Sequence, residues 1–205
     1  EYGETAVCNL GSLNLNNHLI KNEDGSYAVD YSKLKKTINI AMRMLDNVID
    51  INFYPTEEAR KSNLAHRPVG LGSMGWHDIF HKLNIHLDSE EAIEASSNLA
   101  VERGTYSTYE NSLWSQGIFP MDTYKEVMKT RSVRAISRLR GDVNWDDLRQ
   151  KVSKQGMRNS NTMAIAPTAT ISSIVGSSQS IEPIYSVLFV YSTLSGEFTM
   201  INEHF

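Results

Sequence analysis

Apolar residues recur at helical spacing between residues 32 and 51, and this stretch is the clearest predicted helix. Asp30 or Ser32 is placed to cap its first turn, and Pro55 follows its end. The charged residues Lys35, Lys36, Arg43 and Asp46 lie largely off the apolar stripe. The stripe consists of Leu34, Ile38, Ala41, Met42, Leu45, Val48 and Ile49.

Three further stretches have weaker helical signals. Residues 74–83 and 145–155 are predicted helices, and Gly156 closes the second because glycine adopts left-handed backbone at little cost. A third helix is predicted to start at Ser89, whose hydroxyl can cap it, and to run as far as Ser115.

After Gly156 the hydropathy pattern changes to short apolar runs. Residues 161–166 are expected to form a strand that ends at Pro167, and the small residues of 171–176 follow the turn. Residues 184–191 are rich in β-branched and aromatic side chains, which predicts a buried strand. Helices alternating with short strands favour an α/β architecture. No repeat or linker is visible, so we expect a single domain.

Composition narrows the class of protein. The 205 residues carry 20 Lys and Arg against 24 Asp and Glu, and 40% of them are hydrophobic. This balance argues against a disordered tail and against a nucleic-acid-binding arm. No apolar run reaches the roughly 20 residues that a bilayer requires, and residues 1–4 do not show the basic-then-apolar pattern that predicts a secretion signal. Cys8 is the only cysteine, so we expect no internal disulfide and a reducing cytoplasm.

Both ends of the sequence look cut. The chain starts at Glu1, without Met and directly in motif-like residues, and it stops at Phe205 without a polar tail. We therefore expect a fragment of a longer protein.

Gly70 to Gly75 match the G-x-G-x-x-G pattern of dinucleotide-binding loops. The residues before them, 64–69, do not predict a convincing strand. About 20 residues further on, where an acidic residue should follow a second strand, Ser89 looks like a helix start. The glycines are better explained by close packing of a helix or strand against a neighbour, so a nicotinamide-dependent dehydrogenase ranks last.

Two other patterns are better explained without a ligand. Residues 125–158 contain ten positive and four negative side chains, but Trp145 is the one aromatic there, which favours a solvated surface over a polyanion site. His77 and His81 have the spacing of a zinc pair, yet zinc needs a third ligand, and Asp78 stands where the zinc-protease motif has Glu. We expect neither a nucleic-acid partner nor a metal site.

The stretch 164–173 is a candidate anion site. A strand ends, Pro167 turns the chain, and small hydroxyl residues open a helix, whose first amides carry partial positive charge. Thr168 and Thr170 would add hydroxyl donors, and Ala169 would permit close approach. The alternative is an ordinary Thr/Ser-rich turn. Cys8, by contrast, is expected from its local sequence to be a small buried side chain without an activating neighbour.

Taken together, these segments resemble the large (α) subunit of class I ribonucleotide reductase over nearly the whole chain. Ala6–Leu15 is similar to the family segment that holds one of two active-site reducing cysteines. His66–Gly75 resembles its glycine-rich barrel segment, and Met157–Pro183 resembles its substrate-phosphate loop and the residues that come after it. Leu194–Phe198 is a further family-like stretch.

The resemblance implies an α/β fold that is part of a ten-stranded α/β barrel, with residues 1–205 as one partial catalytic domain. It also implies the family's activity, which is the reduction of ribonucleoside diphosphates to deoxyribonucleotides for DNA replication by thiyl-radical chemistry. The thiyl-radical cysteine, with its Asn and Glu companions, would lie before Glu1. We therefore expect no turnover from this chain alone.

The resemblance also assigns roles to individual residues. Cys8 would be one of the two redox-active thiols, with its partner cysteine outside the chain. The substrate diphosphate would be held through backbone amides and hydroxyls by Pro167, Thr168, Ala169, Thr170 and Ile171. Some relatives have an acidic residue where Ala169 stands, so only the backbone contact carries over at that position.

The partners implied by the resemblance are the missing portions of the α subunit, a radical-generating β subunit that contains the metal, and thioredoxin or glutaredoxin as reductant. This segment itself would bind no cofactor. Two alternatives stay open: a class II reductase that uses adenosylcobalamin, and a non-enzymatic α/β interaction domain.

Overall fold

The structure is a computed structural model that describes residues 3–82, 90–120, 122–123, 144–184, 186–193 and 195–201. These residues cluster into two compact units, each of which is described by itself. Unit 1 comprises residues 1–11, 35–71 and 86–164, and unit 2 comprises residues 12–34, 72–85 and 165–205. The single-domain boundary 1–205 stays a prediction.

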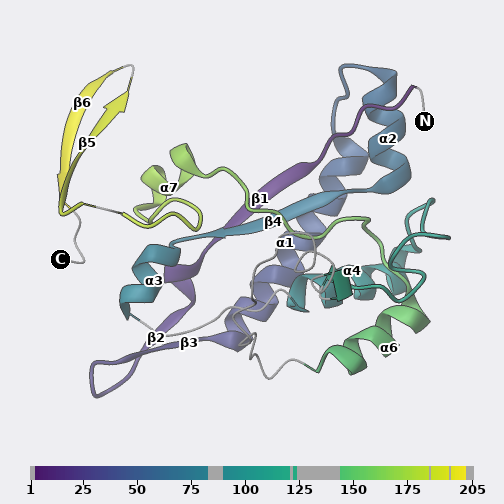
Figure 1. Ribbon diagram of the computed structural model, residues 1–205, viewed down its shortest axis with the longest axis horizontal. Coiled ribbons are helices and arrows are strands. Elements are labelled where there is room, and N and C mark those ends of the chain that lie inside the picture. The colour runs from purple at the N-terminus through teal and green to yellow at the C-terminus, as the bar shows by residue number, and fades with distance from the viewer. Residues whose placement is uncertain are drawn as a thin grey trace. The chain divides into compact units, whose positions relative to one another are not determined.

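Helices and strands are mixed along the chain (Figure 1), which agrees with the predicted α/β class. The described elements are β1 (Asn9–Asn14), η1 (Leu15–His18), β2 (Leu19–Lys21), β3 (Tyr27–Val29), α1 (Tyr31–Ile51), α2 (Glu57–His66), β4 (Val69–Met74), α3 (Trp76–Lys82), α4 (Glu90–Arg103), α6 (Trp145–Gln155), α7 (Ala169–Val175), β5 (Leu188–Thr193) and β6 (Gly196–Ile201).

Helix α1 confirms the clearest sequence prediction. Asp30 caps it, because its carboxylate accepts a hydrogen bond from the amide of Lys33 at 2.9 Å. Leu34, Met42 and Ile49 of the predicted stripe are buried. Asp46 lies off the predicted stripe, yet its side chain is 0% exposed. Its burial depends on partners from other parts of unit 1.

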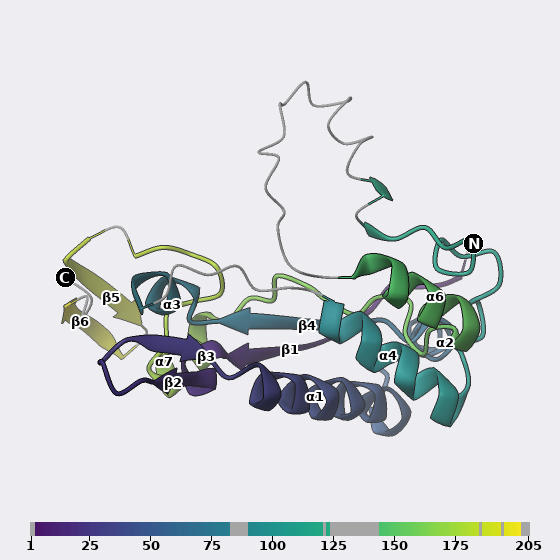
Figure 2. The same cartoon turned by 90° about the horizontal axis from the view of Figure 1, so that it is seen from below.

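Strands β1 and β4 pair with each other and run in the same direction (Figure 2). On the other edge of β4, the amide of Leu71 donates to the carbonyl of Thr162 at 3.0 Å, and Leu71 forms a parallel bridge with Met163. The predicted strand at 161–166 is therefore reduced to an isolated bridge. Three neighbouring extended segments, two of them paired in parallel with β4, fit part of an α/β barrel.

The glycine pattern at 70–75 lies mostly inside a strand. Gly70 and Gly72 belong to β4, and the chain turns into α3 only after Gly75, at a φ of +87°. Phosphate-binding loops place these glycines in the turn itself, so the dinucleotide alternative is wrong. The predicted helix 74–83 starts later than expected, at Trp76, and ends at Lys82 within the described residues.

The core of unit 1 lies between α4 and α6, which are neighbours in Figure 1. Its buried residues are Ile93, Tyr106, Phe119, Leu148, Val152 and Met157. Helix α6 confirms the prediction for 145–155, with Asn144 accepting from the amide of Asp147 at 3.3 Å and Gly156 at a φ of +74°. Helix α4 ends at Arg103 instead of Ser115, because Gly104 turns the chain at a φ of +77°. The predicted cap Ser89 lies outside the described residues.

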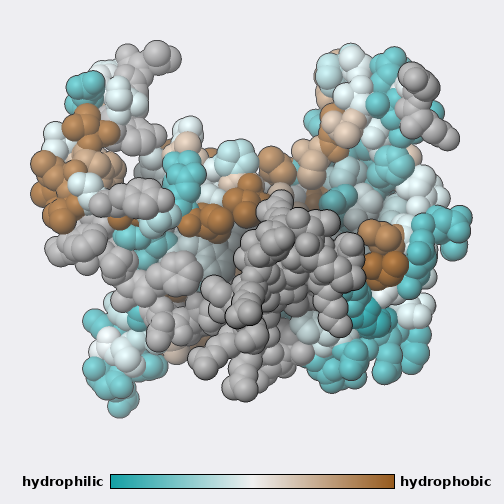
Figure 3. All heavy atoms as spheres, in the orientation of Figure 1, coloured by the Kyte–Doolittle hydropathy of each residue, from teal (hydrophilic) through white to brown (hydrophobic). Residues whose placement is uncertain are grey.

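Unit 2 contains two antiparallel hairpins, β2–β3 and β5–β6. The second corrects the prediction of a buried strand at 184–191: β5 starts at Leu188, and apolar side chains on both strands are exposed. Figure 3 shows them as apolar surface over β5–β6, and they include Leu188, Val190, Phe198, Met200 and Ile201.

Among the described residues, no helix combines the length and the apolar character that crossing a membrane requires. Most of the basic run lies outside the described residues, at 124–143. In its described part, Arg149 pairs with Asp122 at 2.8 Å and Lys151 pairs with Glu94 at 2.6 Å. These ion pairs support a structural role for the described charges of the basic run, rather than a polyanion site.

Candidate functional site

Cys8 lies in unit 1, just before β1, and the structure corrects the expectation that it is buried: the residue is exposed. Its Sγ donates weakly to the carbonyl of Asn9 at 3.7 Å. The exposed thiol just before β1 is accessible to other molecules.

Because Gly70 has no side chain, Leu10, Ala164 and Cys8 can lie close to its backbone. A Cβ added at Gly70 would lie 2.6 Å from Cδ2 of Leu10, 2.8 Å from Cβ of Ala164 and 3.5 Å from Sγ of Cys8. The first two distances are too short for carbon atoms in contact. The absence of a side chain at Gly70 therefore allows the start of β1, β4 and the segment before Pro167 to approach closely, as the sequence predicted for these glycines. We call Gly70, Leu10 and Ala164 the Cys8 seat.

Partial burial of the side chain raises the pKa of the Cys8 thiol above its ordinary value. The sulfur is consequently protonated at neutral pH. A protonated thiol is a poor nucleophile, but it carries the hydrogen that a reducing thiol gives up. The raised pKa of Cys8 therefore argues against a role as a covalent nucleophile.

The predicted phosphate turn, residues 167–171, lies in unit 2. Pro167, Ala169, Thr170 and Ile171 are exposed there, whereas Thr168 is only 1% exposed. Helix α7 begins at Ala169, so the amides of its first turn point out of the helix end toward the exposed side. The turn thus presents backbone donors and one threonine hydroxyl, that of Thr170, to the outside.

The hydroxyl of Thr168 has a different role from the one expected. It accepts a hydrogen bond from the amide of Ser180 at 2.7 Å, in a buried setting. Its carbonyl accepts from the amide of Ser172 at 2.8 Å, which starts α7. Thr168 therefore links the beginning of α7 to the chain that returns after it.

A buried charge cluster in unit 1 is a feature that the sequence did not reveal. Asp46 accepts from Nε of Arg67 at 2.9 Å and from Nδ2 of Asn159 at 3.1 Å, and it also pairs with Arg103 at 3.0 Å and Arg158 at 3.4 Å. Nδ2 of Asn159 also donates to the carbonyl of Arg67 at 3.0 Å. The cluster links Arg67, which precedes β4, to Asn159, which precedes residues 161–164. Both β4 and residues 161–164 contribute to the Cys8 seat.

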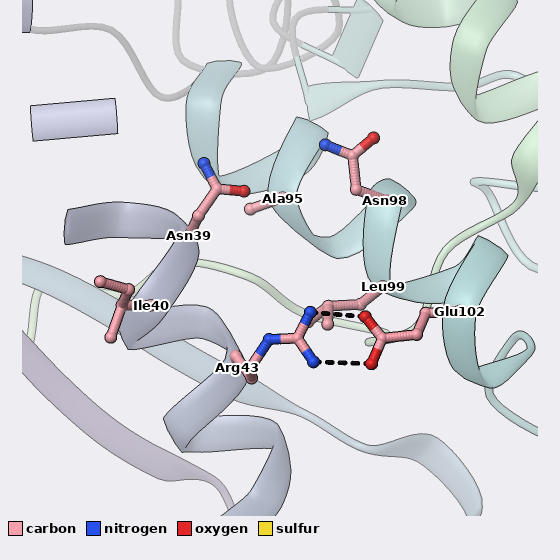
Figure 4. Close-up of a pocket in the computed structure, with 7 residues that line it drawn as sticks. All are labelled: Asn39, Ile40, Arg43, Ala95, Asn98, Leu99 and Glu102. Atoms are coloured by element: carbon pink, nitrogen blue, oxygen red, sulfur yellow. Dashed lines mark hydrogen bonds and ion pairs between the residues drawn. The ribbon is translucent and has the colours of Figure 1, made fainter. Parts of the chain in front are cut away.

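A small open groove of about 170 Å³ lies on unit 1 between α1 and α4 (Figure 4). Arg43 and Glu102 face each other across the groove in a bidentate ion pair, with Nη1 of Arg43 and Oε1 of Glu102 2.6 Å apart. This hydrogen bond lowers the pKa of Glu102 to about 2. None of the predicted site residues lines the groove, and its charges are already paired, so it is a structural contact between the helices.

The zinc-like histidine pair gains no support from its surroundings. Nδ1 of His77 accepts from the amide of Ile184 at 3.3 Å, and the side chain of His81 lies outside the described part. Among the described residues, no group of His, Cys, Asp and Glu is arranged to hold a metal ion.

The α/β elements and the parallel segments around β4 agree with part of an α/β barrel. The chain belongs to the ribonucleotide reductase family: the model for "Ribonucleotide reductase, barrel domain" matches residues 1–205. It is 51% identical over 98% of its length to "Ribonucleoside-diphosphate reductase subunit alpha" of Chlamydia pneumoniae. It is 41% identical over 95% of its length to the protein of the same name in Helicobacter pylori.

A viral relative extends the similarity. The chain is 38% identical over 98% of its length to "Ribonucleoside-diphosphate reductase large subunit" of Variola virus. It covers 20% of the chlamydial relative, 25% of the Helicobacter one and 26% of the viral one. The match confirms the family and the barrel class of the fold, and it concerns a segment of a much longer subunit.

Proposed function

We propose that this chain is a segment of the catalytic α subunit of a class I ribonucleoside-diphosphate reductase. The observation that carries the proposal is an exposed thiol at Cys8, within a chain that matches reductase α subunits along nearly its whole length. The assembled α subunit is defined as this chain together with the upstream and downstream segments that its relatives carry.

The proposed chemistry uses Cys8 as one of two reducing thiols. A thiyl radical on a cysteine outside this chain removes the hydrogen atom from the 3′ carbon of the ribose, and returns it at the end. The 2′ hydroxyl leaves as water. Cys8 and a second cysteine outside the chain together give up two hydrogens and become a disulfide, so that one ribonucleotide and one dithiol yield one deoxyribonucleotide, one disulfide and one water.

The exposed side of residues 167–171 would bind the diphosphate of the substrate. A diphosphate has several negative oxygens, and amides at the start of a helix are donors that favour such groups. Thr170 adds an exposed hydroxyl. Ala169 has no acidic side chain to repel the anion, and its methyl group lets the backbone approach.

The partners are those that this chemistry requires. A separate β subunit that contains the metal would supply the radical, and thioredoxin or glutaredoxin would reduce the Cys8 disulfide after each turnover. We place the enzyme in the cytoplasm, where a reducing environment keeps free thiols reduced. No nucleic acid is part of the proposal.

Reconstitution tests the proposed function. The 205-residue chain alone should show no reduction of cytidine diphosphate (CDP), whereas the assembled α subunit with a class I β subunit and thioredoxin should form deoxycytidine diphosphate. Activity that needs adenosylcobalamin instead of the β subunit would favour the class II alternative. An assembled subunit that does not bind CDP at equilibrium would favour the non-enzymatic interaction domain.

Substitution of Gly70 by alanine should loosen the Cys8 seat. The added Cβ meets Cβ of Ala164, which cannot rotate away, so β4 and the segment at Ala164 must separate. Overpacking of this kind costs about 1–3 kcal/mol. Hydrogen exchange in the assembled α subunit should show protection of the Leu71 amide reduced by about 5- to 150-fold, since 1.4 kcal/mol corresponds to a factor of ten.

Gly11→Ala is the matched control on the neighbouring strand. A Cβ at Gly11 would lie 3.5 Å from the nearest atom of Leu45, which is ordinary contact. Protection of the Leu71 amide should stay within about twofold of the wild-type value, a free-energy change below about 0.5 kcal/mol. Equal protection in the Gly70 and Gly11 variants would show that the seat is not tightly packed.

A further inference from the structure

The chain that follows α7 returns to the beginning of that helix. Twelve residues separate Thr168 from Ser180 in sequence, yet the Thr168 hydroxyl accepts the Ser180 amide at 2.7 Å. Both residues are nearly fully buried, and Ser180 has a φ of +44°, which non-glycine residues seldom adopt. Any movement of the return segment, residues 177–180, is therefore transmitted to Thr168 and to the residues beside it.

The return segment is in turn anchored to α3 through Ser178. The Ser178 amide donates to Oδ2 of Asp78 at 2.9 Å, and its carbonyl accepts from the amide of Gly75 at 2.8 Å. Nδ2 of Asn16 donates to the same Oδ2 of Asp78 at 2.6 Å. Asp78 is only 6% exposed, so water competes little for these hydrogen bonds.

The serines on either side do not provide a second anchor through their hydroxyls. Within the described residues, the buried Oγ atoms of Ser177 and Ser180 have no hydrogen-bond partner. The backbone of Ser178, bound to the Asp78 carboxylate and to Gly75, therefore fixes the return segment at α3, and the Ser178 hydroxyl adds a longer contact by accepting from the Asp78 amide at 3.4 Å. The carboxylate forms the strongest of these contacts, because hydrogen bonds to an ionised group are roughly twice as strong as neutral ones.

We propose that Asp78 is a positioning residue for the substrate diphosphate: by holding Ser178, it fixes the return segment and hence the place of residues 167–171. This inference rests on the proposed function of that turn. Asp78 acts through the backbone of Ser178 and Ser180 and does not touch the substrate itself.

The test is steady-state kinetics with CDP, using the assembled α subunit, its β subunit and thioredoxin. Asp78→Ala should raise KM about tenfold, since it removes one charged acceptor, and should leave kcat within about threefold. A misplaced turn weakens ground-state and transition-state binding alike, which appears in KM. Partial unfolding would instead lower apparent kcat at constant KM. Asp78→Thr serves as a second variant if the alanine variant does not fold. The threonine side chain is too short for its hydroxyl to reach the Ser178 amide.

Two further variants test whether the effect on KM depends on the hydrogen bond to the Ser178 amide. Asp78→Asn keeps an acceptor oxygen in the same place and should restore KM to within about threefold of the wild-type value. Asn16→Ala removes another donor to Oδ2 but leaves the Ser178 contact, and KM should change by less than about twofold. An unchanged KM in Asp78→Ala or Asp78→Thr, or an asparagine variant as impaired as alanine, overturns the inference. A wild-type subunit that binds no CDP instead overturns the proposed function.

Discussion

Replacing Cys8 by serine is expected to abolish multiple turnover in the assembled α subunit. Serine has nearly the same shape, but its oxygen cannot form half of a disulfide, so the two electrons needed to remove the 2′ hydroxyl are not available. Deoxycytidine diphosphate formed over time, with thioredoxin in excess, should fall at least about a thousandfold, or about 4 kcal/mol in activation free energy. CDP binding should remain within about twofold, a change of at most about 0.4 kcal/mol.

Ser12→Ala is the control for this experiment. Ser12 lies on β1, the strand that follows Cys8, and its buried hydroxyl has no hydrogen-bond partner within the described part of the chain. Turnover of the Ser12 variant should stay within about threefold of the wild type. Normal turnover in Cys8→Ser would show that another group carries the electrons.

The largest expected effect on stability comes from Asp46→Ala. This substitution leaves Arg67, Arg103 and Arg158 facing one another around a site from which their shared carboxylate is gone. Breaking a buried ion pair by removing one partner typically costs about 3–5 kcal/mol. We expect a loss of this size in unit 1, measured by hydrogen exchange of α4 and α6 peptides across a urea series.

Asp50→Ala is the matched control, since Asp50 also pairs with Arg67, at 2.7 Å, but its side chain is 49% exposed. Exposed pairs contribute about 0–1 kcal/mol, so the loss should be several times smaller than for Asp46. Equal losses in the two variants would mean that the burial of Asp46 has no energetic consequence.

The same cluster predicts an acid dependence. Burial alone would raise the pKa of Asp46, but the hydrogen bond and charge of Arg67, with Arg158 and Asn159, outweigh it and hold the pKa below its ordinary value. A carboxylate with a lowered pKa stabilises the fold above its unfolded-state value of about 3.9, and this stabilisation is lost as pH falls through the folded-state value. The stability difference between wild type and Asp46→Asn should therefore be constant near neutrality and shrink below about pH 4.

Elements with strong local signals could be predicted from the sequence. Helix α1 has both an apolar stripe and a capping aspartate, and α6 has Asn144 and Gly156 at its ends. Helix α2 was missed because few of its residues are apolar, although Thr56, which caps it by accepting from the Ala59 amide at 3.2 Å, was a usable signal. Gly104 was an equally usable signal for the end of α4.

Other features depend on contacts that no local pattern reveals. Asp46 is buried because arginines 21, 57 and 112 residues away converge on it. The β-branched and aromatic residues of 184–191 predicted a buried strand, yet β5 pairs only with β6 among the described residues and leaves Leu188 and Val190 exposed.

The candidate site was predicted in part. The glycines at 70–75 correctly indicated close packing, and the resemblance to reductases identified Cys8 and residues 167–171, whose roles stay predictions. Local sequence alone suggested a buried, inert Cys8, because Gly70 and Ala164, which shape its surroundings, are more than 60 residues away. The anchoring of Ser178 by Asp78 also joins residues 100 positions apart.

The most direct measurement is a disulfide map of the assembled α subunit after one turnover. The subunit is fully reduced, freed of external reductant, and given CDP and its β subunit; free thiols are then alkylated and the peptides are analysed by mass spectrometry. We expect Cys8 to be found in a disulfide with a cysteine outside this chain, one for each deoxycytidine diphosphate formed. Product formation with Cys8 still a free thiol would contradict this expectation.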